Sequence, residues 1–117
     1  DMNHTELKNA GIDVDSALKR VMGNENLLKR LLGKFLSDPS WIKLVESVEQ
    51  DCKEDALAAS HTLKGVCGYL SMNKLFDLFS EQVHLMREEN WEKAYSMMPE
   101  IKIQYDSVVE GIKNCCV

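Results

Sequence analysis

Apolar residues recur every three or four positions along almost the whole chain, and this period constrains the fold more than any other feature of the sequence. The clearest stripe contains Leu27, Leu28, Leu31, Leu32 and Phe35. Such spacing places apolar side chains on one side of an α-helix, whereas a half-buried strand would alternate every second residue. Neither that alternation nor an Asn-Gly hairpin turn occurs in the sequence. The pattern therefore predicts an all-α fold.

Polar residues and prolines mark where the helices should begin. The expected starts follow caps at Asp13 or Asp15, Asn24, Asp38 and Asp51, and the last two lie at Asn73 and Trp91. Asp51 has Glu54 three residues later, which is the spacing of a capping box. Pro99 is expected to kink or restart the last helix, because proline lacks an amide donor and crowds the preceding turn.

The chain has 117 residues, enough for one compact domain, and a net charge of −5. We expect residues 11–117 to form an antiparallel four-helix bundle with one or two short additional N-terminal helices, because the connections are short. Residues 1–10 are expected to be a tail or a short helix. The helix after Asp38 is expected to bury Trp41, Ile42, Leu44, Val45 and Val48. The negative net charge argues against nucleic acid or an anionic membrane as a partner. A monomer is also expected, because an exposed glycine face suits transient docking better than a permanent dimer.

The four cysteines are Cys52, Cys67, Cys115 and Cys116, and they contain neither a CxxC pair nor the spacing of a small disulfide framework. Reduced thiols in the cytoplasm are therefore expected. A zinc site built from His61 and these cysteines would match no standard ligand spacing, so no metal is predicted on this chain. No role is predicted for Cys115 and Cys116.

The stretch SHTLKGVCGYL, residues 60–70, places two glycines beside a histidine in a predicted helix. Glycine in a helix interior costs about 1 kcal/mol relative to alanine, so another requirement must favour it here. At about 100° per residue, one side of the helix holds His61, Lys64, Gly65 and Gly68. The opposite, buried side holds Cys52, Ala56, Ala59, Leu63, Val66 and Leu70. The histidine is therefore expected to project from the surface, with both glycines giving access to it.

An exposed imidazole of this kind is a candidate nucleophile. A neutral imidazole nitrogen is nucleophilic at cellular pH and can form a covalent intermediate. If His61 accepts a phosphoryl group, Lys64 one turn away can balance the added negative charge. Leu57 and Ala58 lie beside the histidine and offer apolar surface to a docking partner.

Residues 61–65, HTLKG, reproduce an HxLKG motif, and on this motif the chain resembles histidine-containing phosphotransfer (HPt) domains, the four-helix-bundle carriers of two-component phosphorelays. The segments GIDVDSALKRVMGNENLLKRLLGKF and LFSEQVHL resemble the family's opening segment and its helix after the histidine. The similarity covers roughly residues 11–111. There are two departures, because Leu70-Ser71-Met72 stands where the family often has Leu-Gly-Ala, and Cys67 replaces a small alanine or serine.

The resemblance implies that His61 takes a phosphoryl group from an aspartate of one receiver domain and passes it to another, with Lys64 as the neighbouring cation. It also implies a polar residue on the next helix that orients the imidazole. Strict counting reaches Val83, and Gln82 just before it is the candidate for this role. The chain would be a phosphocarrier rather than an enzyme, free-standing or part of a hybrid sensor histidine kinase, and Mg²⁺ would belong to the partner receiver.

Two other interpretations remain open at the level of sequence. One is a pseudo-HPt module that binds a receiver or a kinase through the same surface without accepting phosphate. The other is a metal-binding or purely structural bundle. Direct use of ATP is not expected, because the sequence has no GxxxxGK[ST] phosphate loop.

Overall fold

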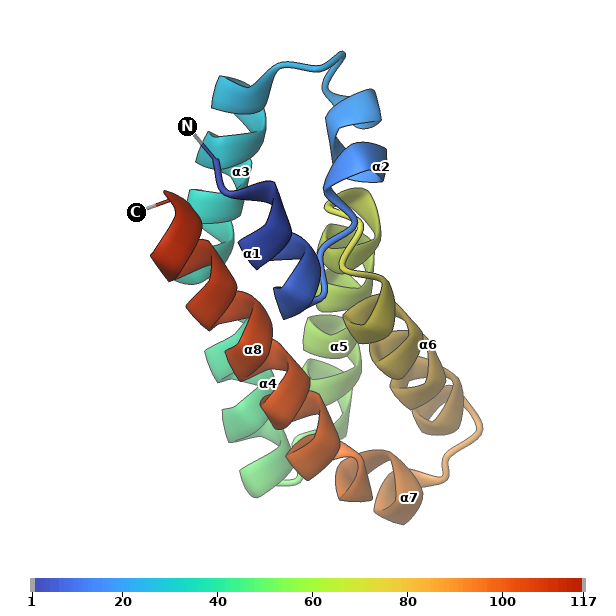
Figure 1. Ribbon diagram of the computed structural model, residues 1–117. Helices are drawn as coiled ribbons and strands as arrows, with labels where there is room; N and C mark the ends of the chain where they lie inside the picture. Colours follow the sequence, from blue (N-terminus) through green and yellow to red (C-terminus); the bar gives the residue numbers. More distant parts are fainter. Residues whose placement is uncertain (1, 117) are drawn as a thin grey trace.

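The computed structural model describes residues 2–116, and all of its regular structure is helical (Figure 1). The helices are α1 (His4–Ala10), α2 (Val14–Arg20), α3 (Glu25–Ser37), α4 (Ser40–Glu49), α5 (Lys53–Tyr69), α6 (Asn73–Arg87), α7 (Trp91–Ser96) and α8 (Met98–Cys116). No strand occurs among the described residues, which confirms the all-α prediction. The body measures 43 × 22 × 20 Å, with α2 and α3 at one end and α7 at the other (Figure 1).

Two of the predicted caps start their helices as expected. Asp13 accepts a hydrogen bond from the amide of Ser16 at 3.1 Å, and Asn24 accepts one from the amide of Leu27 at 3.0 Å. Each bond satisfies an amide that the first turn of a helix leaves without a partner. Gly23 lies between the two helices with φ +76°, a left-handed conformation that suits glycine after a helix end. Local sequence therefore determines where α2 and α3 begin.

The fourth helix begins at Ser40, with Pro39 in the N-cap place, one residue later than the predicted cap at Asp38 implies. The Asp38 carboxylate still accepts a hydrogen bond from the amide of Ser40 at 2.8 Å. The predicted buried face of α4 is wrong at Ile42, whose side chain is 61% exposed. Leu44 is fully buried, and Ile42 lies about 200° around the helix from it. Ser40 and Ser47 occupy the inward side instead.

The predicted capping box at Asp51 does not form. Asp51 has φ +54° and lies in the turn before α5, while Cys52 takes the N-cap place without a side-chain hydrogen bond. The Asp51 carboxylate instead accepts a hydrogen bond from the hydroxyl of Tyr95 at 2.8 Å. This bond ties the α4–α5 turn to α7, so a partner distant in the sequence takes the carboxylate away from the helix end.

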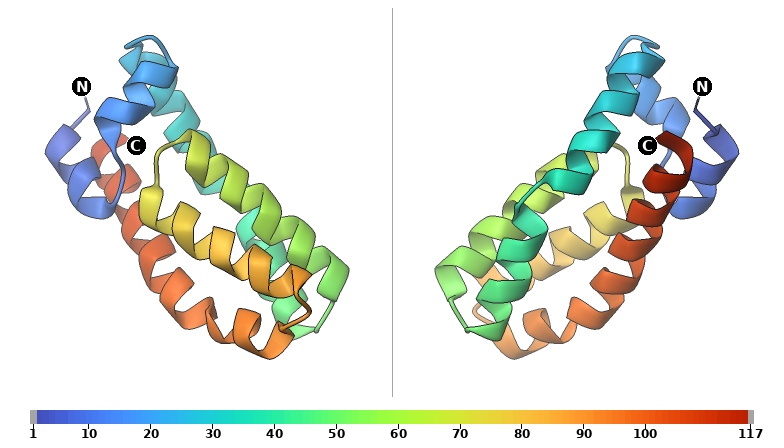
Figure 2. Two further views of the ribbon diagram at one scale, coloured as in Figure 1. Left: turned by 90° about the vertical axis from the view of Figure 1, so that its right-hand side faces the viewer. Right: turned by 90° about the vertical axis from the view of Figure 1, so that its left-hand side faces the viewer.

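Helices α5 and α6 lie side by side and run in opposite directions (Figure 2). The turn between them contains Ser71 with φ +57°. Arg20 of α2 donates hydrogen bonds to the Ser71 hydroxyl and to the carbonyl of Tyr69, the latter at 3.0 Å. These bonds fix the C-terminal end of α5 to α2.

The last two helices are separated at Met97, since α7 ends at Ser96 and α8 begins at Met98. Pro99 therefore restarts the helix rather than kinking it, in the first turn where a missing amide donor is tolerated. No helix within residues 2–116 combines the length and the apolar character needed to cross a membrane.

The first helix packs across α8 (Figure 1), and the two termini lie near each other. Leu7 of α1 is fully buried in the core. The backbone of Gly111 in α8 lies directly against Ala10 of α1, with no room for a side chain between them. Of the two alternatives for this segment, the short helix is confirmed and the tail is wrong.

Candidate functional site

The two sides of α5 have opposite environments. The inward side is buried and contains Ala56, Ala59, Ser60, Leu63 and Cys67. His61 lies on the outward side and is exposed. The expectation that its imidazole projects from the surface is therefore confirmed.

The outward side around His61 is open and lacks internal partners. His61 makes no hydrogen bond and no ion pair with another residue of the described chain, so neither ring nitrogen is engaged by the fold. Leu57 is partly buried and Ala58 is exposed, both about one turn before the histidine. Lys64 is partly buried, and within residues 2–116 no carboxylate oxygen lies within 4.0 Å of its ammonium. An unengaged imidazole and an unpaired cation thus share one side of α5.

The two glycines after His61 have different surroundings. A Cβ built on Gly65 would meet no atom within 4 Å, so its backbone is bare and accessible. A Cβ built on Gly68 would lie 2.9 Å from Cδ1 of Phe76, because the phenyl ring of α6 packs directly on the α5 backbone there. The prediction that both glycines leave the backbone open around His61 agrees with the surroundings of Gly65 and is wrong for Gly68. Gly68 allows two helices to approach, while Gly65 leaves the histidine uncovered.

Gln82 does not orient the imidazole in this structure. Its side chain is fully buried between helices, and its Oε1 accepts a hydrogen bond from the hydroxyl of Ser60 at 2.8 Å. Its Nε2 donates to the carbonyl of Ala94 at 3.1 Å and lies 3.2 Å from the sulfur of Met98. Ser60 precedes His61 and points into the core, so the amide contacts the inward side of the helix that carries the histidine outward. The candidate role of Gln82 as ring-orienting residue is therefore wrong, because its polar atoms are engaged with other groups.

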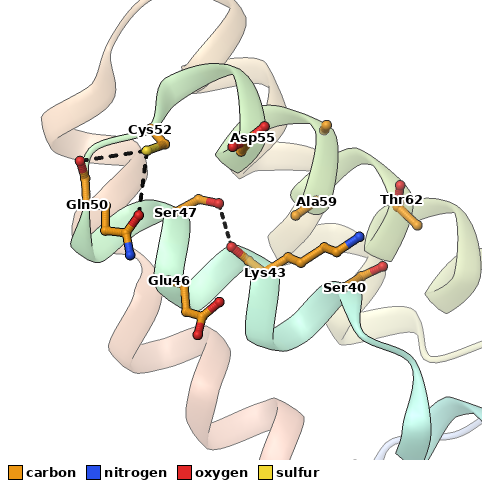
Figure 3. Close-up of a pocket in the computed structure, with 10 residues that line it drawn as sticks. Ser40, Lys43, Glu46, Ser47, Gln50, Cys52, Asp55, Ala59 and Thr62 are labelled. Carbon is orange, nitrogen blue, oxygen red and sulfur yellow. Dashed lines mark hydrogen bonds between the residues drawn. The ribbon is translucent and has the colours of Figure 1, made fainter.

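A groove of about 390 Å³ runs between α4 and α5 beside the histidine, and we call it the α4–α5 groove (Figure 3). Ala58 and Thr62, which flank His61 in the sequence, line its α5 wall. Lys43 of α4 extends along the groove toward Thr62, and Asp55 lies farther along the α5 wall (Figure 3). The groove depends on how α4 crosses α5, so no residue pattern in either helix predicts it.

A second depression of about 340 Å³ lies farther along α5, beside Gly65, and we call it the Gly65 hollow. Its lining is mostly apolar and comes from α3, α5 and the loop before α4, with Leu31, Lys34, Phe35, Asp38, Gly65, Val66, Tyr69 and Leu70. Tyr69 is 49% exposed at its rim. The exposed imidazole of His61 therefore lies one turn before an apolar depression that begins at Gly65.

The four cysteines are not arranged as a metal site around His61. Cys67 lies on the inward side of α5 and is fully buried, whereas His61 points outward from the same helix. Burial raises the pKa of the Cys67 thiol to about 12, and the charge of Asp38 adds to this effect. Within the described residues, no three His, Cys, Asp or Glu side chains converge in a way that could hold a metal ion. The zinc interpretation built on His61 and the cysteines is therefore not supported by the geometry.

No family model, no curated protein and no solved structure matches this chain. The resemblance to HPt domains rests on the HxLKG motif and the two flanking segments alone.

Proposed function

We propose that this chain is a phosphorelay intermediate, in which His61 accepts a phosphoryl group from an aspartate of one receiver domain and transfers it to another. The observation that carries the proposal is the outward side of α5. There, within residues 2–116, the exposed His61 has no hydrogen-bond or ion-pair partner and Lys64, one turn away, has no acidic partner, while the backbone at Gly65 is bare. A histidine that was only an ordinary exposed residue of the helix would not require a glycine one turn away.

The proposed architecture is an antiparallel four-helix bundle of HPt type. Its histidine helix would be α5, with α4, α6 and α8 as the other members and α1 and α2 as the additional N-terminal helices. The contacts of α5 with both α4 and α6, and of α6 with α8, support this arrangement. A rigid helix as carrier would keep the imidazole in place for reversible transfer, because little reorganisation is needed before attack.

The transfer step follows from the free ring nitrogens. The lone pair of His61 Nε2 attacks the phosphorus of the partner's aspartyl phosphate, in line with the bond that breaks. The N–P bond forms, the P–O bond to the aspartate breaks, and the carboxylate leaves with the bonding electron pair. Lys64 offsets the phosphoryl charge that arrives beside the ring. Transfer to a second receiver reverses these bonds, and Mg²⁺ in each receiver is expected to neutralise charge on the partner's side.

The proposed docking surface for the receiver consists of Leu57, Ala58 and Gly65, together with the Gly65 hollow. It is small and partly apolar, which suits a transient complex. Gly68 is removed from this surface because Phe76 covers its backbone. The proposal includes a monomeric chain in the cytoplasm, with a hybrid sensor histidine kinase as a further partner.

The test is phosphotransfer from radiolabelled, phosphorylated receiver domains to the purified chain. The expected product is an acid-labile, base-stable label on the wild type that is absent from His61→Gln. His84→Gln is the matched control, because His84 is an exposed histidine on the neighbouring helix α6 and its loss should leave labelling unchanged. Equal labelling of His61→Gln and wild type would exclude His61 as the acceptor.

The same assay separates the proposal from the pseudo-HPt alternative. If receivers bind the chain, no receiver in the panel transfers its label, and binding survives His61→Ala, the chain is a binding module rather than a carrier.

A further inference from the structure

Four of the six glycines in this chain have a reason within the fold. Gly11 and Gly23 have φ values of +107° and +76°, and residues with a side chain rarely adopt these backbone angles. Gly68 and Gly111 lie where another helix approaches, against Phe76 and Ala10. The remaining two, Gly33 and Gly65, are inside helices with open space above them.

Gly33 is therefore unexplained by the packing of the chain. It lies in the middle of α3, where glycine destabilises a helix relative to alanine, and a Cβ built there would meet nothing within 4 Å. The comparable residue Gly65 leaves the backbone bare beside the candidate nucleophile. For the same reason, the bare backbone at Gly33 leaves room for a bound ligand.

The surroundings of Gly33 form a polar depression of about 530 Å³, which we call the Gly33 hollow. It is lined by Asn24, Asn26, Lys29, Arg30, Gly33 and Cys116, with no aromatic or aliphatic side chain among them. Its volume lies within the range of small-ligand sites, and its lining includes two cationic and two amide side chains.

Two cations in the hollow lack an acidic partner in the part of the chain that the structure describes. Within residues 2–116, no carboxylate oxygen lies within 4.0 Å of Lys29 or Arg30. Glu25, the acidic residue nearest to them in the sequence, instead contacts His4 at 3.1 Å. The side-chain amide of Asn26, one turn before Arg30, likewise makes no hydrogen bond in this part of the chain. These groups are free to bind an anion on a protein whose net charge is −5.

We propose that the Gly33 hollow binds a compact polyphosphate anion, held by Lys29, Arg30 and Asn26 over the bare backbone of Gly33. A guanidinium binds two phosphate oxygens through parallel hydrogen bonds, and a neighbouring ammonium adds a point charge. A compact anion is favoured over a nucleotide because no side chain in the lining can stack on a base. The proposal does not depend on His61, which lies on another helix.

The experiment is a titration of the ¹⁵N-labelled chain with sodium pyrophosphate at constant ionic strength, followed by amide shifts. Saturable shifts are expected at residues 26–33 of α3 and near Cys116. Lys29→Gln/Arg30→Gln should weaken binding by about tenfold or more, because it removes two charged hydrogen bonds. Lys53→Gln/Lys93→Gln removes the same charge at the opposite end of the molecule and should leave affinity unchanged (Figure 1).

Two further arms test the nature of the site. Gly33→Leu places a side chain in the hollow at a position where a Cβ meets no atom within 4 Å, so it should abolish binding while circular dichroism shows unchanged helix content. Citrate, a carboxylate anion of similar charge, should bind clearly more weakly than pyrophosphate. The proposal is overturned if both double variants weaken binding equally, if Gly33→Leu binds as the wild type does, or if citrate binds equally well.

Discussion

The inward and outward sides of α5 use the same kinds of residue in opposite ways. On the inward side, the buried Ser60 is hydrogen-bonded to Gln82. On the outward side, one residue farther along, His61 has no partner within the described chain. Ser60, which the fold uses, thus directly precedes His61, which has no partner within residues 2–116. The glycines differ in the same way, because Phe76 covers the backbone of Gly68 while the backbone of Gly65 is bare.

This difference separates residues that hold the structure from residues that are available for chemistry. Within residues 2–116, no buried side-chain nitrogen or oxygen lacks a hydrogen-bond partner, as expected of a stable core. The groups left unengaged lie on the surface. Substitutions on the inward side of α5 should therefore mainly lower stability. Substitutions on the outward side should mainly slow the proposed phosphotransfer.

The largest effect on stability is expected from Gln82→Ala. The change removes the acceptor of the buried Ser60 hydroxyl and leaves a cavity between α5, α6 and α7, so we expect the free energy of unfolding to fall by about 2–4 kcal/mol. His61→Ala, on the outward side, should change it by less than about 0.5 kcal/mol. Urea denaturation monitored by circular dichroism measures both.

A double variant shows whether the hydrogen bond causes the effect. Ser60→Ala/Gln82→Leu replaces both partners with apolar groups and should be clearly more stable than Gln82→Ala. If Gln82→Ala and His61→Ala cost the same, the contrast between the two sides of α5 is wrong.

The helices could be predicted because their signals are local. The caps at Asp13 and Asn24 act on amides three residues away, and apolar periodicity identifies each buried stripe. The errors occur where a distant contact decides. Asp51 bonds to Tyr95 of α7 instead of capping α5, and Ile42 is apolar but lies opposite the core.

The same division applies to the site. The exposure of His61 and the bare backbone at Gly65 follow from the period of α5 alone. The surroundings of Gln82 and Gly68 depend on the register of α6 against α5, which brings together residues 22 and eight positions apart. The spacing of residues within one helix does not determine that register. The predictions that Gln82 orients the imidazole and that Gly68 gives access to it are therefore wrong.

The second prediction uses the buried thiol of Cys67. Burial raises its pKa from an ordinary 9.0 to about 12, so the unfolded chain loses this proton before the folded one does. The stabilisation is complete below pH 9 and is lost as the pH rises toward 12. At pH 10, one unit above the unfolded value, the loss from this group is about 1 kcal/mol.

The measurement is the free energy of unfolding in urea at pH 8 and at pH 10. The decrease between the two should be smaller in Cys67→Ala than in the wild type by about 1 kcal/mol. Cys52→Ala is the control, because Cys52 is only partly buried and its loss should leave the decrease intact. An equal decrease in Cys67→Ala and wild type would show that Cys67 is not held in a protonated, water-excluded site.

The third prediction concerns Gly68→Ala. The new methyl group would meet the Phe76 ring at 2.9 Å, and overpacking of this kind costs about 1–3 kcal/mol. Alanine regains about 1 kcal/mol of helix propensity, so a net loss of about 1 kcal/mol is expected in urea denaturation. Phe76→Leu removes the ring that the new methyl group meets, so Gly68→Ala should cost less stability in the Phe76→Leu background than in the wild type. A double-mutant cycle measures this difference. A Gly68→Ala variant more stable than the wild type would contradict the close approach of the two helices.

The last and smallest effect on stability has the opposite sign. Gly65→Ala adds a methyl group where nothing lies within 4 Å, so helix propensity alone acts and stability should rise by about 0.5–1 kcal/mol. In the proposed transfer, the same methyl group lies one turn from His61 and displaces the incoming aspartyl phosphate, which should slow labelling by about tenfold or more. The variant would then be more stable and less active, whereas Gly68→Ala would be less stable and would leave the bare backbone at Gly65 unchanged. If Gly65→Ala gains stability and labels at the wild-type rate, access to the imidazole does not require a bare backbone, and the glycine beside His61 needs another explanation.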